Sequence, residues 1–270
     1  MKTETKHRIL LLSAWLSIPF SMWYCIHIDD WTLFFYAYFL AQFNKVIGNN
    51  IAFHRYFTHR SFKTTKFKHN LLAFWTILLA SKSPIVYAMN HRHHHKFADT
   101  DKDTHSPVTS FWHTITGAWE FRGYKWFNDK GVEFKVRDLM RDPTLKFIER
   151  HYFKIWYGII IISLAIDWRI LVFAFLLPAG HYHLAANLAV VGLDHLKILG
   201  SYRTYNTPDN SYNHHFIAWG SLGEGYHNNH HHDPNRYNQA FNKGEFDICA
   251  WIVDKLFIVN NENSSKTYNF

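Results

Sequence analysis

The sequence predicts an all-α integral membrane protein in which four transmembrane helices form two hairpins and a cytosolic helical lobe carries a histidine-rich metal site. Three observations lead to this prediction. Apolar stretches close to the length that crosses a bilayer occur in two pairs, a short polar turn joins the members of each pair, and histidine clusters lie in the polar regions that follow. A mean hydropathy of −0.23 requires a sizeable polar part outside the bilayer, and we interpret residues 1–270 as one domain.

The first predicted hairpin covers residues 9–53. Ile9–Ile28 has the length that crosses a bilayer, is longer than the apolar core of a signal peptide, and lacks a small-residue cleavage site after it, so we expect it to be retained. Asp29 and Asp30 form a very short turn. The second span, residues 31–53, ends in polar residues and should therefore continue past the lipid into the aqueous side.

The second predicted hairpin covers residues 152–191. Residues 152–166 are short for a span, because 15 residues of helix rise only about 22 Å. Asp167-Trp168-Arg169 form the turn, and Ile170–Val191 is the fourth span, interrupted by Pro178 and Gly180. Between the hairpins, Lys68–Met89 is expected to be an interfacial or lobe helix, because a fifth span would move the last histidine cluster to the other face.

The two hairpins place the N-terminus and the lobe, residues 54–151 and 192–270, on one side. Of the 29 Lys and Arg residues, Arg169 alone falls in the two turns on the opposite side, which also hold Asp29, Asp30 and Asp167. The positive-inside rule therefore places the lobe in the cytoplasm. The two cysteines form no disulfide framework, and the net charge of +8 comes without a basic-aromatic module, so we expect no nucleic-acid partner.

Three histidine clusters follow the apolar stretches. The second and third clusters repeat an i, i+3, i+4 spacing, which places three imidazoles on one face of a helix. His54 and His59 are five residues apart, about 140° around an α-helix, so we expect them where a helix ends. His93 and His232 fall on the wrong face. The candidate ligands are His54, His59, His91, His94, His95, His227, His230 and His231.

Eight imidazoles are too many for one metal ion and about right for two. Many imidazoles without paired cysteines favour an iron-type site over structural zinc. Two other interpretations are a histidine tract that binds metal fortuitously and a metal transporter or sensor without catalytic activity. A tract would be contiguous, and a transporter would need polar residues within its spans, whereas these histidines are dispersed and lie outside them.

Three segments together resemble the histidine boxes of membrane fatty acid desaturases. They read HRYFTHRSF from His54 to Phe62, HRHHHKFADTDKDTHSP from His91 to Pro107, and GEGYHNNHH from Gly223 to His231. The branch with this pattern includes the acyl-CoA Δ9 (stearoyl-CoA-type) desaturases and their bacterial relatives. Box order, hairpin topology and the Pro208–Ser211 stretch also fit, and the resemblance covers about residues 9–240.

The resemblance implies a centre of two iron ions that uses O₂ and is bound almost wholly by histidine. It assigns the eight histidines above as ligands and adds an Asn and a ninth His at the end of the last span. Asn187 stands at a suitable place for the Asn, which contacts iron through water. The family's His follows four residues later, where this chain has Val191, so His195, eight residues on, is the predicted ninth ligand.

The implied reaction inserts a cis double bond, at Δ9, into a saturated acyl chain linked to CoA, a carrier or a lipid. Removing hydrogen from an unactivated chain requires an oxidised metal–oxygen species. Val86-Tyr87 and Asp103-Thr104-His105 replace the branch's usual Asp-Trp and Asp-Pro-His, near the expected acyl chain or head group. A related di-iron hydroxylase or ketolase is the alternative. The chain shows no haem-binding His-Pro-Gly-Gly, which implies a separate ferredoxin or cytochrome b5 as electron donor.

Further residues are candidates for supporting the reaction. Carboxylates beside the boxes could orient the imidazoles, tryptophans could line an acyl tunnel, and basic residues could hold an anionic head group, although each set is also explained by solvated charge or ordinary core. The carboxylates are Asp99, Asp103, Glu224 and Asp233; the tryptophans are Trp75, Trp112, Trp119 and Trp219; the basic residues are Lys63, Lys66, Arg122 and Lys125.

Overall fold

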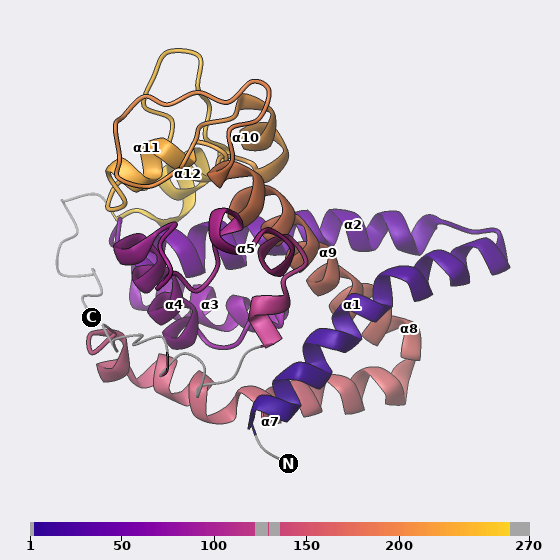
Figure 1. Cartoon of the computed structure of the whole chain (residues 1–270). Coiled ribbons are helices and arrows are strands. Elements are labelled where there is room, and N and C mark those ends of the chain that lie inside the picture. The colour runs from indigo at the N-terminus through magenta and orange to yellow at the C-terminus, as the bar shows by residue number, and fades with distance from the viewer. Residues whose placement is uncertain (1–2, 122–128, 130–135, 260–270) are drawn as a thin grey trace.

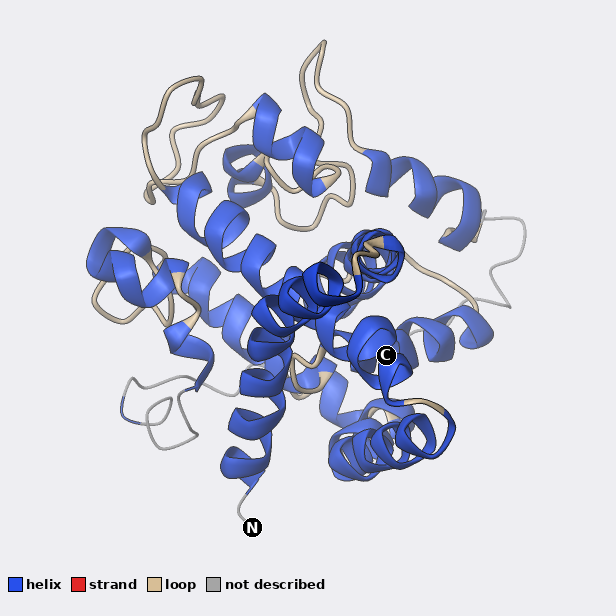
Figure 2. Ribbon diagram, turned by 90° about the vertical axis from the view of Figure 1, so that its right-hand side faces the viewer, coloured by secondary structure: helices blue, strands red, loops and turns tan. Residues whose placement is uncertain are grey.

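The computed structural model describes residues 3–121, 129 and 136–259, and the regular elements within these residues are helices (Figures 1 and 2). Isolated bridges join Tyr202 to Asn213 and Asn213 to Tyr226. The described part of the chain therefore has the all-α character that the sequence predicts.

The first long helices leave and return through a tight turn. Helix α1 spans Thr3–Ile28, and α2 spans Thr32–Asn44 and continues directly into a π-helix, η1, over Lys45–Thr58. The turn closes because Asp29 takes a left-handed φ of 52° and the Asp30 carboxylate accepts a hydrogen bond from the Thr32 amide at 2.8 Å. In Figure 1 the pair forms an arm that points away from the rest of the molecule.

The second pair begins earlier than the sequence pattern indicates. Helix α7 spans Pro143–Ile166, starting where Asp142 accepts a hydrogen bond from the Leu145 amide at 2.9 Å. After Asp167, the chain runs as one helix over residues 168–195. Its parts are α8 (Trp168–Ile170), η5 (Leu171–Leu176), α9 (Leu177–Ala185), η6 (Ala186–Gly192) and η7 (Leu193–His195).

The predicted interruption at Pro178 and Gly180 is wrong. Pro178 lies in the first turn of α9, directly after the π-helical η5, where a missing N–H is tolerated. Gly180 is needed for packing: a Cβ there would lie 2.3 Å from the carbonyl oxygen of Ala14, so α1 crosses α9 in backbone contact.

Two helices, Thr3–Ile28 and Trp168–His195, are long and apolar enough to cross a membrane. A third candidate is the bent pair formed by Lys66–Leu79 and Pro84–Phe97, which meet at 81°. The predicted single helix over Lys68–Met89 is therefore wrong, because left-handed φ values at Ala80 and Lys82 break it. The bent pair comprises α3 (Lys66–Trp75), the 3-10 helix η2 (Thr76–Leu79) and α4 (Pro84–Phe97). Residues 31–53 and 152–166 remain predicted spans.

The remaining elements pack against several of the helices above. They are α5 (Pro107–Ile115), η3 (Ala118–Phe121), η4 (Leu139–Arg141), α10 (His215–Ser221), α11 (His227–His232), α12 (Ile248–Ile252) and η8 (Val253–Phe257). Of these, α5 and α10 pack against η6, η3 against α1, η4 against α7, and α12 against η1. Helices α10 to α12 form the upper part of the molecule in Figure 1, above α4 and α5. Buried Arg55 on η1 joins this part to the rest, because its guanidinium donates to the Tyr237 carbonyl at 2.7 Å and to Asp247 at 2.9 Å.

Candidate metal centre

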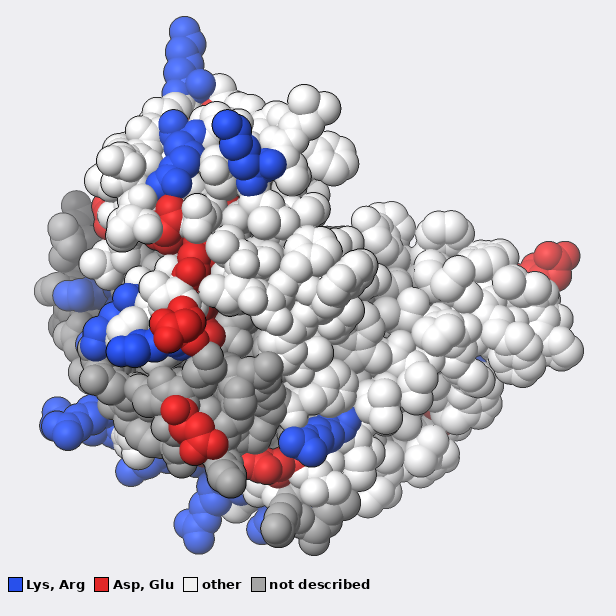
Figure 3. All heavy atoms as spheres, in the orientation of Figure 1, with Lys and Arg blue, Asp and Glu red and all other residues white. Residues whose placement is uncertain are grey.

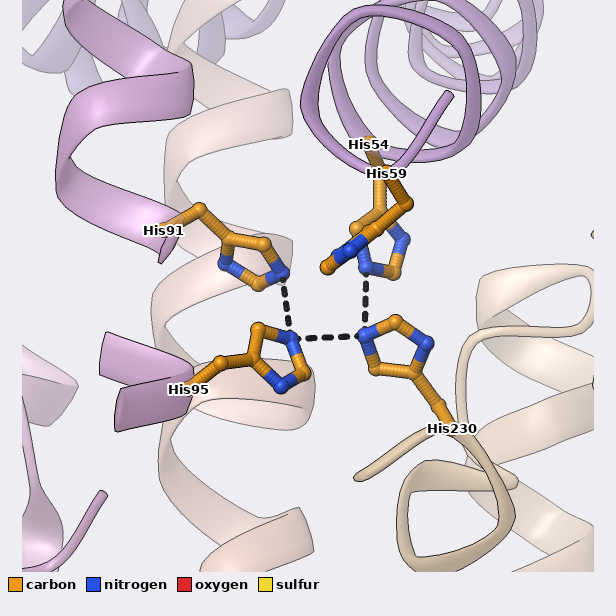
Figure 4. A group of neighbouring side chains, drawn as sticks. All are labelled: His54, His59, His91, His95 and His230. Atoms are coloured by element: carbon orange, nitrogen blue, oxygen red, sulfur yellow. Dashed lines mark hydrogen bonds between the residues drawn. The ribbon is translucent and has the colours of Figure 1, made fainter. Parts of the chain in front are cut away.

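Five histidines from three elements, two of them buried and three half-buried, converge in one group (Figure 4). His54 and His59 come from η1 and its end, His91 and His95 from α4, and His230 from α11. One ring nitrogen from each lies within 4.8 Å of the others. The Nε2 atoms of His54 and His230 are 2.9 Å apart, those of His230 and His95 2.9 Å, and those of His95 and His91 3.1 Å.

Four further histidines form a second group of the same kind. They are His94, His195, His227 and His231, again with one nitrogen each within 4.8 Å. The Nε2 atom of His227 lies 3.0 Å from that of His195 and 3.1 Å from that of His231. The nine histidines that the sequence analysis singles out therefore lie in two adjoining groups.

Each i, i+3, i+4 cluster is divided between the two groups. On α4, His91 and His95 belong to the first group and His94 to the second; on α11, His230 belongs to the first and His227 and His231 to the second. The expectation that three residues of one helical face share one metal region was too coarse. A face one turn long is wide enough to reach two neighbouring positions, so each helix serves both.

His54 and His59 share a group because their helix is not an α-helix. The amide of His59 donates to the carbonyl of His54 at 3.2 Å, an i to i+5 hydrogen bond that closes a π-turn. Residues five apart therefore lie one turn apart, rather than the 140° expected for α-helical geometry. π-Helical turns are frequent at functional sites, and here the turn aligns the first box.

Four carboxylates each accept a hydrogen bond from the Nδ1 side of one histidine. Asp103 holds His94 at 3.0 Å and Asp99 holds His195 at 3.0 Å. Glu224 holds His54 at 2.5 Å and Asp209 holds His231 at 2.9 Å. Of the four predicted carboxylates, Asp99, Asp103 and Glu224 have this contact, whereas half-buried Asp233 has none with a box histidine. Sequence reasoning missed Asp209, although it had singled out the Pro208–Ser211 stretch.

The carboxylates beside the histidines are held in the charged form. Burial alone would raise the pKa of Glu224, but the Arg55 guanidinium and the His54 ring lower it to about 2. Burial likewise opposes ionisation of Asp99, and the hydrogen bond from His195 lowers its pKa to about 2. A charged carboxylate facing Nδ1 keeps the proton on that nitrogen, which leaves the Nε2 lone pair pointing into the group.

The donor set fits a pair of metal ions. Burial, and then the neighbouring ring of His54, hold the pKa values of His59 and His230 well below the usual range, so these imidazoles are neutral. Nε2 of His59 is buried without a hydrogen-bond partner among the described residues. Where Nδ1 carries the proton, as in His54 beside Glu224, the Nε2 lone pair that faces the group can bind a cation, and neutral imidazole is the commonest metal ligand.

Asn187 lies beside the histidines but is engaged elsewhere. Its Nδ2 donates to Glu120 and, at 2.9 Å, to the carbonyl of His183, and its Oδ1 accepts a hydrogen bond from Trp119 at 2.8 Å. Glu120 in turn holds Nδ1 of His183 at 2.7 Å. The sequence analysis missed this Glu120–His183 pair.

A cavity of about 600 Å³ opens against both histidine groups. His54 and His91 of the first group and His94, His195 and His227 of the second line it, and the size is that of a small-molecule site. The side chains beyond the histidines are largely apolar, among them Val86, Ala186, Leu188, Val191 and Ile217.

Only part of the predicted supporting set reaches this cavity. Trp119 lines it and stacks on His105 with ring centroids 4.5 Å apart, whereas Trp75, Trp112 and Trp219 do not line it. Lys63 and Lys66 are also absent from its wall. Arg122 and Lys125 lie outside the residues that the structure describes.

Comparison with known proteins agrees with the arrangement of the boxes. The family described as fatty acid desaturase matches residues 29–243. Delta-9 acyl-lipid desaturase 1 of Arabidopsis thaliana is 31% identical over 79% of this chain and 68% of its own length. The sn-1 stearoyl-lipid 9-desaturase of Anabaena variabilis is 30% identical over 85% of this chain and 82% of its own length. Icosanoyl-CoA 5-desaturase of Limnanthes douglasii is 28% identical over 84% of this chain, which spans 63% of that relative.

Proposed function

Because the chain belongs to the fatty acid desaturase family, we propose that it is an O₂-dependent acyl desaturase that inserts a cis double bond at Δ9 of a saturated chain. The names of two relatives specify position 9 and support this bond position. Another relative is named for position 5, so the position of the double bond has to be measured. The acyl chain is joined to CoA, a carrier or a lipid.

The observation that carries the proposal is the contact between the two histidine groups and the apolar cavity. Two iron ions bound by the nine histidines would supply the O₂-derived oxidising power that an unactivated C–H bond demands. Five of those histidines also form the cavity wall, so a chain in the cavity would lie against the centre. A metal store or sensor has no need for such a cavity.

The protein's own contribution is positioning and the exclusion of water. Charged carboxylates keep four imidazoles in the tautomer that offers Nε2, and buried side chains surround both groups. The apolar walls hold a saturated chain by burial rather than by specific polar contacts. This arrangement fixes one methylene pair without activating it chemically.

We further propose that Asn187 makes the water-mediated contact to iron that the family pattern implies. A carbonyl oxygen has two lone pairs, and Trp119 uses one of those on Oδ1. The other is available to a water molecule. Asn187 lies on η6 and His195 on η7, so both predicted additions to the boxes come from the continuous helix of residues 168–195.

In the proposed topology residues 31–53 and 152–166 also cross the membrane, which gives four spans with the metal centre on the cytoplasmic side. Exposed apolar side chains on these helices support it: Phe35, Tyr36 and Phe39 on α2, and Ile161, Ile162 and Ile166 on α7. Electrons come from a separate ferredoxin or cytochrome b5.

The test is the acyl-chain profile of a desaturase-deficient host that expresses this chain, measured by gas chromatography–mass spectrometry after derivatisation of double bonds. We expect a new monounsaturated chain with wild type and none with His94→Ala. A hydroxylated product would replace desaturase by hydroxylase. If no product forms and the purified protein lacks about two irons per chain, the proposal fails.

A further inference from the structure

Among the residues that the structure describes, the exposed part of the wall of the cavity beside the histidines carries no charged side chain. Of the side chains that line the cavity, the exposed ones are Tyr38 on α2, Leu188 on η6, Ile198 just after η7, and Phe216 and Gly220 on α10. Phe216 is 90% exposed although it lies on the wall of the cavity. We take these five exposed residues as the mouth of the cavity.

The mouth lies along the side of the helices that cross the membrane. Tyr38 is nine residues beyond Asp29, about 13 Å along a helix, and Leu188 is 21 residues beyond Asp167, about 31 Å. The hydrocarbon core of a bilayer is about 30 Å thick. If both helices cross from their acidic turns, the mouth extends from inside the bilayer to its cytoplasmic surface.

Apolar surface continues from the spans onto the rim. Figure 3 shows an uncharged face that runs from the α1–α2 arm across the middle of the molecule to the upper lobe, with acidic residues at the tip of the arm. Trp219, one helical turn from Phe216, is 63% exposed, and Leu199 beside Ile198 is fully exposed. Aromatic residues are enriched at this depth in membrane proteins.

Among the described residues, the charges around the mouth suit a lipid better than coenzyme A. Coenzyme A carries several phosphate groups, which proteins hold with Lys and Arg. Lys45 and Lys82 are the described cations on the cavity wall; Lys45 is buried beneath the rim, where its Nζ donates to the Gly220 carbonyl at 3.1 Å. Exposed Lys197, next to Ile198, offers one ammonium at the membrane surface, where a lipid head group would remain.

We propose that the substrate is an acyl chain of a membrane glycerolipid, which enters the cavity sideways through the mouth between α2, η6 and α10. This inference rests on the proposed desaturase function and names its substrate class. The head group stays at the cytoplasmic surface of the bilayer, and the chain passes between Leu188 and Phe216 toward the histidines. No chain has to leave the lipid phase before it reaches the centre.

The substrate class is tested in the host that reveals the desaturase product. The cells receive a lysoglycerolipid whose deuterated octadecanoyl chain is attached through an amide, which lipases and acyltransferases cannot move to coenzyme A. We expect the amide-linked chain to become monounsaturated with wild type and to stay saturated with His94→Ala. If deuterated free stearate yields an unsaturated chain and the amide-linked chain stays saturated, the inference fails and the proposed function stands. If neither changes, the proposed function itself fails.

The position of the mouth has a test that needs no turnover. The native Cys25 and Cys249 are buried, so an introduced cysteine can be labelled selectively with an environment-sensitive fluorophore. In vesicles, brominated lipid should quench the label in Phe216→Cys as it does in Phe39→Cys on α2, and should spare exposed Met140→Cys in η4. Quenching of Phe216→Cys by aqueous iodide instead of bromolipid would overturn the inference.

Discussion

At the scale of single residues, the carboxylates decide which nitrogen each histidine offers. Asp209 is the clearest case because its two oxygens have separate partners: Oδ1 accepts from the Ser211 amide at 2.9 Å, and Oδ2 faces Nδ1 of His231. Asparagine in its place can keep the contact with Ser211, but it then turns an N–H toward His231. The ring must then accept that hydrogen bond at Nδ1 and carry its own proton on Nε2, so the nitrogen that faces the metal position no longer offers a lone pair.

We therefore predict that Asp209→Asn weakens iron binding at the second histidine group about 10- to 100-fold while the protein stays folded. Metal analysis of the purified protein over a series of chelator concentrations should show one iron lost more readily than the other. Asp233→Asn is the matched control, because Asp233 follows the same box and contacts none of its histidines. Equal iron retention in the two variants would contradict the role of Asp209.

Arg55 is the buried cation that the carboxylates near the first box require. Its guanidinium pairs with Glu224, which holds His54, and with Asp247 at 2.9 Å, and all three side chains are buried. Burying a carboxylate without its partner is costly. Sequence reasoning passed over this residue because an arginine between two ligands resembles an ordinary surface charge.

We predict that Arg55→Met destabilises the protein by about 3–5 kcal/mol, since two buried carboxylates lose their counter-ion. Thermal unfolding in detergent measures the loss. Arg60→Met serves as control: Arg60 is partly exposed and lies 3.6 Å from Asp138, so its ion pair should contribute no more than about 1 kcal/mol. A similar loss of stability in both variants would show that the buried ion pairs of Arg55 contribute no more to stability than the exposed pair of Arg60.

At the scale of elements, the sequence was enough to identify the histidines. It did not show which of them belong to the first group and which to the second. The boxes are visible because i, i+3, i+4 spacing is a property of α-helices, and both α4 and α11 are α-helical. The sequence correctly predicts that His54 and His59 lie where a helix ends, but the π-helix over Lys45–Thr58, whose last turn brings them into one group, leaves no mark in the apolar pattern. The bend at Ala80 likewise depends on backbone conformation rather than on composition.

The contact between α1 and α9 also depends on a feature that the sequence composition does not reveal, the close approach of two helix backbones. Gly180 looks like a helix breaker in the sequence, yet a Cβ at this position would meet the Ala14 backbone at 2.3 Å. The missing side chain of Gly180 allows α1 to approach the backbone of α9. Gly158 on α7, by contrast, has open space where a Cβ would lie.

We predict that Gly180→Ala forces α1 away from α9 and lowers stability by about 1–3 kcal/mol, the usual cost of overpacking. Gly158→Ala should be neutral or stabilise by about 0.5–1 kcal/mol, because alanine favours the helix and meets no neighbour. Unfolding midpoints of the two variants, measured side by side, provide the comparison. If Gly180→Ala unfolds at the wild-type temperature, the helices are not in the close contact described.

At the scale of the whole molecule, the metal centre and the membrane constrain each other. Two helices meet the length and composition of a span without further assumption, but the histidines come together only if their three elements meet on one side. An odd number of crossings between the first and last box would separate them. The convergence of His54, His94 and His230 within adjoining groups therefore favours an even number of crossings, which requires α7 to cross as well.

Cysteine labelling from one side of the membrane tests that topology. We predict that Asp30→Cys and Arg169→Cys, in the two turns, react with a membrane-impermeant thiol reagent added outside intact cells. Lys243→Cys, exposed in the lobe, should react only after the membrane is opened. The buried Cys25 and Cys249 should give little background. If Arg169→Cys is labelled only together with Lys243→Cys, residues 152–166 do not cross, and the exposed isoleucines of α7 must instead rest on the membrane surface or another protein.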